Sequence, residues 1–153
     1  MHVEELTIEE CHLALAQARL GRLACARDNQ PHVIPIYFAV DEAYIYAFSV
    51  GGQTLEWMRD NPCVCLEIDN VHLASDWTSV VVLGSYEELP DTLEHRAARG
   101  RAHDLLQGRA MWWEPGTLVG PHREKSAELT PIYYRISMEH LSGRRGAPSP
   151  AKQ

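Results

Sequence analysis

Two adjacent glycines, Gly51-Gly52, stand between an aromatic-rich stretch and a segment with the spacing of a short helix. The aromatic-rich residues 43–49 favour a strand. Leu55 and Met58 lie three residues apart, as two side chains on one face of a helix do. A glycine turn that opens a helix presents unpaired backbone N–H groups at the positive end of the helix dipole. The sequence therefore predicts a binding site for an anionic group, such as a phosphate, at residues 49–54.

No metal site is expected, because the cysteines and histidines lack the spacing of one. Among the four cysteines only Cys63 and Cys65 lie close together, two residues apart on a predicted strand. A zinc site would need a second pair, and neither C-x-x-C nor H-E-x-x-H occurs in the chain. We interpret the cysteines as small apolar residues in a reduced core. The sequence also contains no recognisable catalytic constellation, so the catalytic residues are left unassigned.

Composition excludes several classes of protein. With 45% hydrophobic and 23% charged residues, the 153-residue chain has the make-up of a soluble globular domain. The formal net charge of −7 and the lack of a basic stripe argue against nucleic acid as a partner. No apolar run approaches the roughly 20 residues of a membrane span, and the acidic N-terminus does not resemble a signal peptide. We expect a cytoplasmic protein with one domain over residues 1–141 and a disordered, Pro/Gly-rich tail over residues 142–153.

The order of the predicted elements indicates the fold class. Three helices are predicted over residues 6–18, 54–61 and 91–107, and six strands over residues 22–27, 32–40, 43–49, 63–69, 77–89 and 130–138, with a loop over 70–76. Thr7 and Glu10 form a capping box at the start of the first helix, and Gly21 is expected to stop it. Pro35 requires a sheet edge, a bulge or a split in its strand. Gly84 is a predicted bulge.

Short turns between strands favour an antiparallel meander, and the alternation of strands and helices typical of a Rossmann sheet is missing. Neither G-x-G-x-x-G nor a P-loop sequence is present. The prediction is an α+β, mainly β protein: a barrel of about six to seven mostly antiparallel strands with short flanking helices.

An ordered series of segments resembles the flavin-binding split β-barrel of the pyridoxamine 5′-phosphate oxidase superfamily. The segments are GRLAC, PHVIPIYFAVDEAYIYAFS, a helix ending in RDNP, WTSVVVLGSYEEL and YYRISMEHLSGR. They look most like the flavin-nucleotide-binding, nitroimidazole-resistance-like branch. The resemblance implies a split β-barrel, and a homodimer that holds FMN in clefts between its two subunits.

The resemblance also implies roles for individual residues. Along the isoalloxazine ring it places Val33, Ile34, Pro35 and Ile36. At the ribityl and phosphate end it places Phe48, Ser49, Gly52, Gln53 and Thr54. Thr78 and Ser79 would approach the flavin from the long strand, and Trp113 would cover the site from the partner subunit.

At the phosphate end this chain departs from the pattern of its relatives. They commonly carry Arg-Lys where this chain has Gln53-Thr54. A charged hydrogen bond contributes about 1.5–3 kcal/mol against about 0.5–1.5 kcal/mol for a neutral one. FMN binding is therefore expected to be weakened unless Arg22 or Arg59 reaches the site, and a deazaflavin or haem remains an alternative ligand.

Two functions from different classes follow. The first is a flavin-dependent oxidoreductase that oxidises or reduces a small organic molecule, with the flavin carrying the redox chemistry. The second is a non-catalytic flavin- or haem-binding protein, or a barrel with weakened cofactor binding. A purely structural dimeric domain is the remaining alternative.

Overall fold

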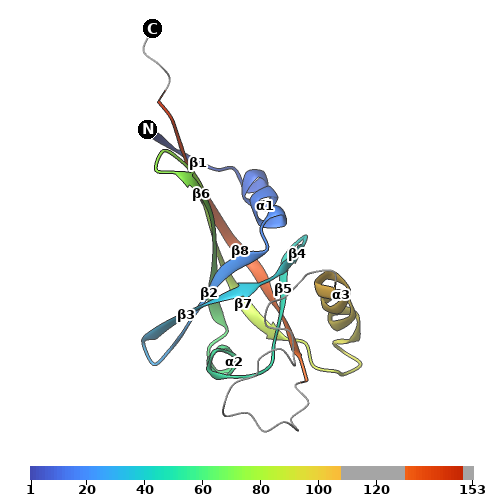
Figure 1. Ribbon diagram of the computed structural model, residues 1–153. Helices are drawn as coiled ribbons and strands as arrows, with labels where there is room; N and C mark the ends of the chain where they lie inside the picture. Colours follow the sequence, from blue (N-terminus) through green and yellow to red (C-terminus); the bar gives the residue numbers. More distant parts are fainter. Residues whose placement is uncertain (108–129, 150–153) are drawn as a thin grey trace, which may run out of the picture.

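The computed structural model describes residues 1–107 and 130–149, which form one eight-stranded antiparallel sheet flanked by three helices (Figure 1). The strands are β1 (His2–Glu5), β2 (Leu20–Arg27), β3 (Gln30–Tyr37), β4 (Ala39–Asp41), β5 (Tyr44–Ser49), β6 (Cys63–Leu73), β7 (Asp76–Glu88) and β8 (Ile132–Ala147). The helices are α1 (Ile8–Gln17), α2 (Gln53–Asp60) and α3 (Arg96–Gln107). The strand order is β3-β2-β6-β7-β8-β5-β4, and β1 pairs with β8. The predicted α+β split barrel is confirmed.

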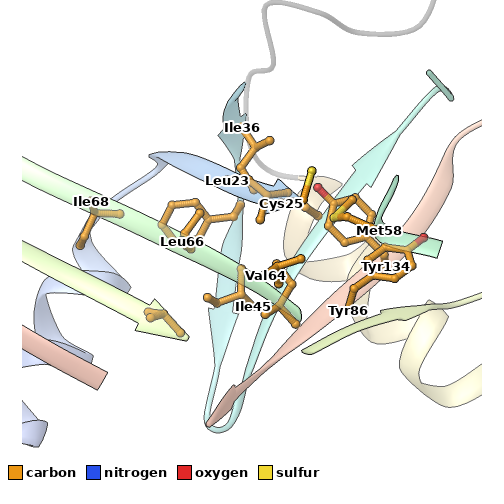
Figure 2. Close-up of a cluster of buried hydrophobic side chains, with 14 of the residues drawn as sticks. Leu23, Cys25, Ile36, Ile45, Met58, Val64, Leu66, Ile68, Tyr86 and Tyr134 are labelled. Atoms are coloured by element: carbon orange, nitrogen blue, oxygen red, sulfur yellow. The ribbon is translucent and has the colours of Figure 1, made fainter. Parts of the chain in front are cut away.

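The inside of the curled sheet forms the main hydrophobic core, which we call the inner core. Because side chains alternate along a strand, every second residue of β2, β5, β6 and β7 points inward. Figure 2 shows Leu23, Ile45 and Leu66 from three of these strands gathered together. Leu15 of α1 and Met58 of α2 are buried in the same cluster. These two helices therefore cover the inner face.

A second cluster lies on the opposite side of β4 and β5, under α3. Ala102 and Leu106 of α3 pack there against Tyr46 of β5 and Leu89. The neighbours of Tyr46, including Ile45, belong to the inner core. Strand β5 is therefore covered on both faces.

The long hairpin formed by β6 and β7 was predicted only in part. The expected loop over residues 70–76 is wrong, since β6 continues to Leu73 and only two residues turn the chain into β7. Exposed residues cover the end of β6 on both faces, so no hydrophobic alternation marks it as a strand. Backbone pairing with β7, out to Leu73 opposite Asp76, holds this extension.

The C-terminal strand is also longer than predicted. It was expected to end at Met138 and to give way to a disordered tail from residue 142, but β8 continues to Ala147. Its last residues pair with β1 on one side and β7 on the other, including Glu4 opposite Arg145. Arg145 Nε donates to a Glu4 carboxylate oxygen at 3.1 Å. The segment is polar, so its composition did not predict a strand, but pairing with β1 and β7 stabilises one. Residues 150–153 lie outside the described part of the chain.

The first helix confirms its capping box. The Glu10 N–H donates to the Thr7 hydroxyl at 3.2 Å, and the Thr7 N–H donates to the Glu10 carboxylate at 3.1 Å. The helix ends at Ala18 rather than at Gly21, which lies inside β2. A Cβ on Gly21 would sit 3.0–3.1 Å from its nearest neighbours, so that glycine allows close packing instead of stopping a helix. The third helix begins at Arg96, five residues later than predicted.

Pro35 and Gly84 behave as their chemistry requires. Strand β3 is at the edge of the sheet, where Pro35, which has no backbone N–H to donate, is tolerated. The predicted strand over residues 32–40 divides at Phe38, whose N–H donates to the Arg19 carbonyl at 3.1 Å. The register between β7 and β8 shifts between Leu83 and Gly84, which confirms the predicted bulge.

Candidate functional site

The glycine turn opens helix α2 as predicted. Gly51 and Gly52 have φ angles of 100° and 116°, a left-handed region that side chains disfavour. Gly52 is the N-cap of α2, and no side chain caps the helix start. Among residues 1–107 and 130–149, no atom lies within 4 Å of a Cβ built on either glycine, so these residues leave the turn open to a ligand. The Ser49 hydroxyl accepts from the Gly51 N–H and donates to the Gly51 carbonyl, each at 3.2 Å, so it stabilises the turn itself.

A histidine that the sequence interpretation did not include lies beside this turn. His32 Nε2 is 3.0 Å from the Thr54 hydroxyl oxygen, and the His32 ring centroid is 5.5 Å from that of Trp57. His32 is half-buried on β3, and Thr54 is in the first turn of α2. In the sequence, the feature that could have pointed to His32 was its position directly before residues 33–36, which the resemblance places along the flavin ring. We call Gly51, Gly52, Thr54 and His32 the cradle.

The two arginines considered as substitutes for a missing cation are engaged elsewhere. Arg59 Nε donates to a Glu88 carboxylate oxygen at 2.8 Å, at the opposite end of α2 from the cradle. Arg22 Nη1 lies 3.3 Å from an Asp69 carboxylate oxygen. The basic side chain hydrogen-bonded to Thr54 is His32.

The four residues predicted to lie along a flavin ring divide between two faces of β3. Ile36 is buried and Ile34 packs against the inner core, whereas Val33 is 60% exposed and Pro35 is exposed. The pleat of the strand causes this division. Only Val33 and Pro35 present side chains to the outside of the barrel.

A row of side chains continues from Pro35 across the outer face. Pro35 is opposite Arg22 of β2, Arg22 is opposite Glu67 of β6, and Glu67 is opposite Val81 of β7. These residues are half-buried or exposed, in contrast with the buried residues between them. We call this surface of β3, β2, β6 and β7 the outer face.

The outer face carries a charged cluster beside Pro35. Arg22 Nη1 lies 3.7 Å from a Glu67 carboxylate oxygen and 3.3 Å from one of Asp69. Partial burial raises the pKa of Glu67 above its ordinary value, the hydrogen bond to Asp69 and its negative charge add to the rise, and Arg22 opposes it. The sequence interpretation did not single out this cluster. In the sequence, the two-residue spacing of Glu67 and Asp69 could have indicated this cluster, because it places both side chains on one face of a strand.

Thr78 and Ser79 do not share a face. Thr78 lines a cavity of about 420 Å³ under α1, together with Ala14 and Val80. Ser79 lines a different cavity of about 650 Å³ with Trp77 and others. Only one of the two can approach a ligand held against a single face of β7.

Phe48 faces α3. Its ring centroid is 5.9 Å from that of Tyr133, and both rings pack against the cluster under that helix. Gln53 is exposed at the start of α2. Trp113 lies outside the described residues.

Residues 1–107 and 130–149 lack two further features. No group of three or more histidine, cysteine or acidic side chains in these ranges could hold a metal ion. Within the same ranges, no helix has the length and apolar character needed to cross a membrane.

Comparison with known proteins gives a consistent result. The family model described as pyridoxamine 5′-phosphate oxidase matches residues 7–145. The uncharacterized protein RA0666 of Rhizobium meliloti (strain 1021) is 40% identical over 144 residues, which cover 94% of this chain and 95% of the relative.

Two solved structures extend the comparison. A crystal structure of a FAD-binding protein from Mesorhizobium loti is 43% identical, with a TM-score of 0.80 over 96% of this chain and 100% of that one. A candidate 5-nitroimidazole antibiotic resistance protein from Bacteroides thetaiotaomicron is 14% identical, with a TM-score of 0.66 over 95% of this chain and 89% of that one. The second likeness concerns the fold alone.

Proposed function

Because this chain belongs to the pyridoxamine 5′-phosphate oxidase family, we propose that it binds FMN and uses it to oxidise or reduce a small organic molecule. The 43% identical Mesorhizobium loti protein is described as FAD-binding, which supports a flavin as the ligand. The observation that carries the proposal is the cradle at the start of α2.

The donor set of the cradle fits a phosphate. The uncapped first turn of α2 offers backbone N–H groups at the positive end of the helix dipole. Thr54 adds a hydroxyl, and His32 adds a ring nitrogen within 3.0 Å of it. The positive φ angles of Gly51 and Gly52 leave the turn without side chains that would block a close approach.

In this proposal His32 takes the part of the cation that relatives supply at residues 53 and 54. A protonated imidazole donates from both ring nitrogens. When Nε2 donates to Thr54, the hydroxyl proton of Thr54 is free to point to the phosphate. The imidazole then lies one hydrogen bond away from the phosphate instead of in direct contact with it.

The flavin ring is proposed to lie against the outer face at Val33 and Pro35. The bound flavin supplies the electron transfer chemistry. The chain contributes a partly apolar surface beside the Arg22 guanidinium, which ion pairs with Glu67 and Asp69 hold in place. Partial burial raises the pKa of Glu67 and so favours the protonated form of this carboxyl group.

A second copy of the chain is proposed to cover the outer face. Val33 and Leu83 are 60% and 48% exposed, and Val71 and Leu73 at the tip of the long hairpin are exposed as well. Apolar side chains at this density are typical of surfaces that associate. A homodimer would enclose the flavin ring between its subunits and exclude water from it.

A non-catalytic flavin or haem carrier is the alternative, and Gln53-Thr54 favours it. Without a lysine or arginine at these positions, the phosphate is held by weaker donors. A protein that binds flavin and never turns over would retain the cradle and leave the outer-face charges without a role in chemistry. A deazaflavin would use the same cradle, because it also carries a phosphate.

The test is the absorbance spectrum of the purified protein, followed by titration with FMN. The proposal expects a flavin band at about 450 nm, and FMN binding that exceeds riboflavin binding because riboflavin lacks the phosphate. Turnover is then assayed with a nicotinamide donor and a panel of small acceptors. A colourless protein that takes up no FMN would overturn flavin binding, and FMN binding without any turnover would support the carrier.

A further inference from the structure

A cavity of about 370 Å³ lies between α3 and the start of β8, on the side of the sheet away from the inner core. Its lining includes Arg96, Arg99 and His103 of α3 and Tyr133 of β8, and the acidic residue on its wall is Asp91. We call it the α3 pocket. Its volume is within the range of pockets that hold small organic ligands.

The basic residues line one side of the pocket because of their spacing. Arg96, Arg99 and His103 are three and four residues apart, so they follow one face of the helix. Gly100 lies between them without a side chain, and no atom lies within 4 Å of a Cβ built there. The helix therefore presents positive charge and leaves room in front of it.

Arg99 is held in position without being neutralised. Its Nη1 donates to the Leu89 backbone carbonyl at 3.0 Å, and its guanidinium carbon lies 4.9 Å from the centre of the Tyr133 ring. Neither partner is a carboxylate. A guanidinium has five N–H donors, so donors remain for a ligand.

Arg101, on the same helix, differs from Arg99 in having a carboxylate partner. Its Nε donates to an Asp41 carboxylate oxygen at 2.7 Å, which neutralises its charge. Within the described part of the chain, neither Arg96 nor Arg99 forms an ion pair with an acidic side chain. The α3 pocket thus concentrates unneutralised positive charge on a chain whose formal net charge is −7.

His103 adds a third donor. Its Nδ1 lies 3.0 Å from the Tyr133 hydroxyl oxygen, and the two rings meet nearly edge to face at 79°. This contact leaves Nε2 of His103 for another partner. Two arginines and a histidine around an aromatic floor form an arrangement that suits a phosphate or carboxylate on an organic ligand.

We propose that the α3 pocket binds the phosphate or carboxylate group of a small organic anion. The Tyr133 ring lies 5.9 Å from the Phe48 ring, and Phe48 is three residues before the glycine turn of the cradle. The anion has two possible sources: the adenylate half of a dinucleotide flavin bound at the cradle, or a separate acidic substrate. The first source rests on flavin binding at the cradle, whereas the second does not, because the residues of the α3 pocket are not those of the cradle.

The test compares the double variant Arg96→Gln/Arg99→Gln with the control Arg101→Gln on the same helix. Binding of ADP and of phthalate is measured by calorimetry on the full chain. The proposal expects at least one probe to bind, the double variant to weaken it at least tenfold, and Arg101→Gln to change it less than twofold. Tenfold corresponds to about 1.4 kcal/mol.

Titrations with FAD and FMN distinguish the two sources. If the adenylate half occupies the pocket, FAD binds more tightly than FMN and the double variant removes the difference. If a separate anion occupies it, FAD and FMN bind alike and the probe still binds when FMN is present. Because FMN is measured in the same series, failure of the cradle and failure of the α3 pocket give different results.

Three results would overturn the proposal. Neither probe binds the wild-type chain at about 10 mM, a concentration that would reveal millimolar affinity; the double variant binds as the wild type does; or Arg101→Gln weakens binding as much as the double variant. Arg99 also supports the Leu89 backbone, so the single variant Arg96→Gln is the measure if the double variant unfolds. The exposed Arg96 side chain has no structural partner within the described residues. Arg96→Gln is expected to weaken binding of the probe by about threefold to tenfold.

Discussion

His32 Nε2 lies 3.0 Å from the hydroxyl oxygen of Thr54, and this contact joins the edge strand β3 to the first turn of α2. It brings a titratable side chain to a helix start that has a glycine turn before it. The ring is also packed against Trp57, at 5.5 Å between centroids, so its position is fixed from two sides. The first two predictions test what this contact does.

Replacing His32 should change phosphate binding selectively. We expect His32→Lys to tighten FMN binding by about tenfold, because a permanent charge strengthens a hydrogen-bonded phosphate contact by about 1 kcal/mol or more. His32→Gln should weaken it. Fluorescence titration with FMN and with riboflavin measures both, and riboflavin affinity should stay within about twofold. An equal change for both ligands would mean that His32 acts on the ring or the fold.

Thr54→Lys tests the same site from the helix. A lysine there restores the charge that relatives carry, so FMN should bind about tenfold more tightly. The gain should shrink in the double variant with His32→Lys, since two like charges beside one phosphate repel each other. Unchanged or weaker FMN binding would place the phosphate away from the cradle.

The raised pKa of Glu67 predicts the sign of its contribution to the pH dependence of the free energy of unfolding. Its pKa is raised in the folded chain, so the native state holds its proton more tightly than the unfolded state. That contribution to stability is complete below the ordinary glutamate pKa of about 4.3 and is lost as the pH rises through the native value. Glu67→Gln should therefore gain stability relative to wild type as the pH rises above about 4.3, measured by urea unfolding.

Asp41 is the matched control for that experiment. The hydrogen bond from Arg101 lowers its pKa, so its contribution is present at neutral pH and is lost as the pH falls through the native value. Asp41→Asn should show the opposite trend from Glu67→Gln. The same trend in both variants would contradict the assigned pKa directions.

Gly84 is required by the bulge between β7 and β8. A Cβ at this position would overlap the Ser137 carbonyl oxygen and press on the Ile136 side chain. Gly84→Ala should therefore destabilise the fold by about 3 kcal/mol or more. Gly100→Ala is the control, because nothing lies near its Cβ inside α3, and it should stabilise by about 1 kcal/mol. Denaturant unfolding checks both, and equal effects would show that the bulge tolerates a side chain.

The outer face should control the oligomeric state. Leu83 is 48% exposed on this face, and Leu83→Glu should convert a dimer into a monomer in sedimentation analysis, since burying an unpaired carboxylate is costly. Leu93 is 85% exposed before α3, outside the outer face, so Leu93→Glu should leave the dimer intact. A wild-type monomer at micromolar concentration would refute the proposed homodimer.

Local rules predicted much of the fold. The capping box of Thr7 and Glu10 and the bulge at Gly84 are each set by nearby residues or by the chemistry of one residue, so the sequence revealed them. For Pro35 the sequence allowed an edge, a bulge or a split, and the strand order decided for the edge. The ends of β6 and β8 were not predicted, because contacts with distant parts of the chain, and not local residues, determine them. They are polar, and partners far away in the chain hold them in the sheet.

The sequence by itself determined the glycine turn, the helix after it and the family pattern that points to a flavin. Only the tertiary structure decided which side chains meet there. His32 reaches Thr54 across 22 residues because β3 pairs with β2, on which α2 packs, and the register of three strands brings Pro35, Arg22 and Glu67 into one row. The pleat of β3 turns Ile34 and Ile36 inward, since neighbours on a strand face opposite sides. The glycine turn is now part of a cradle that a histidine from another strand completes.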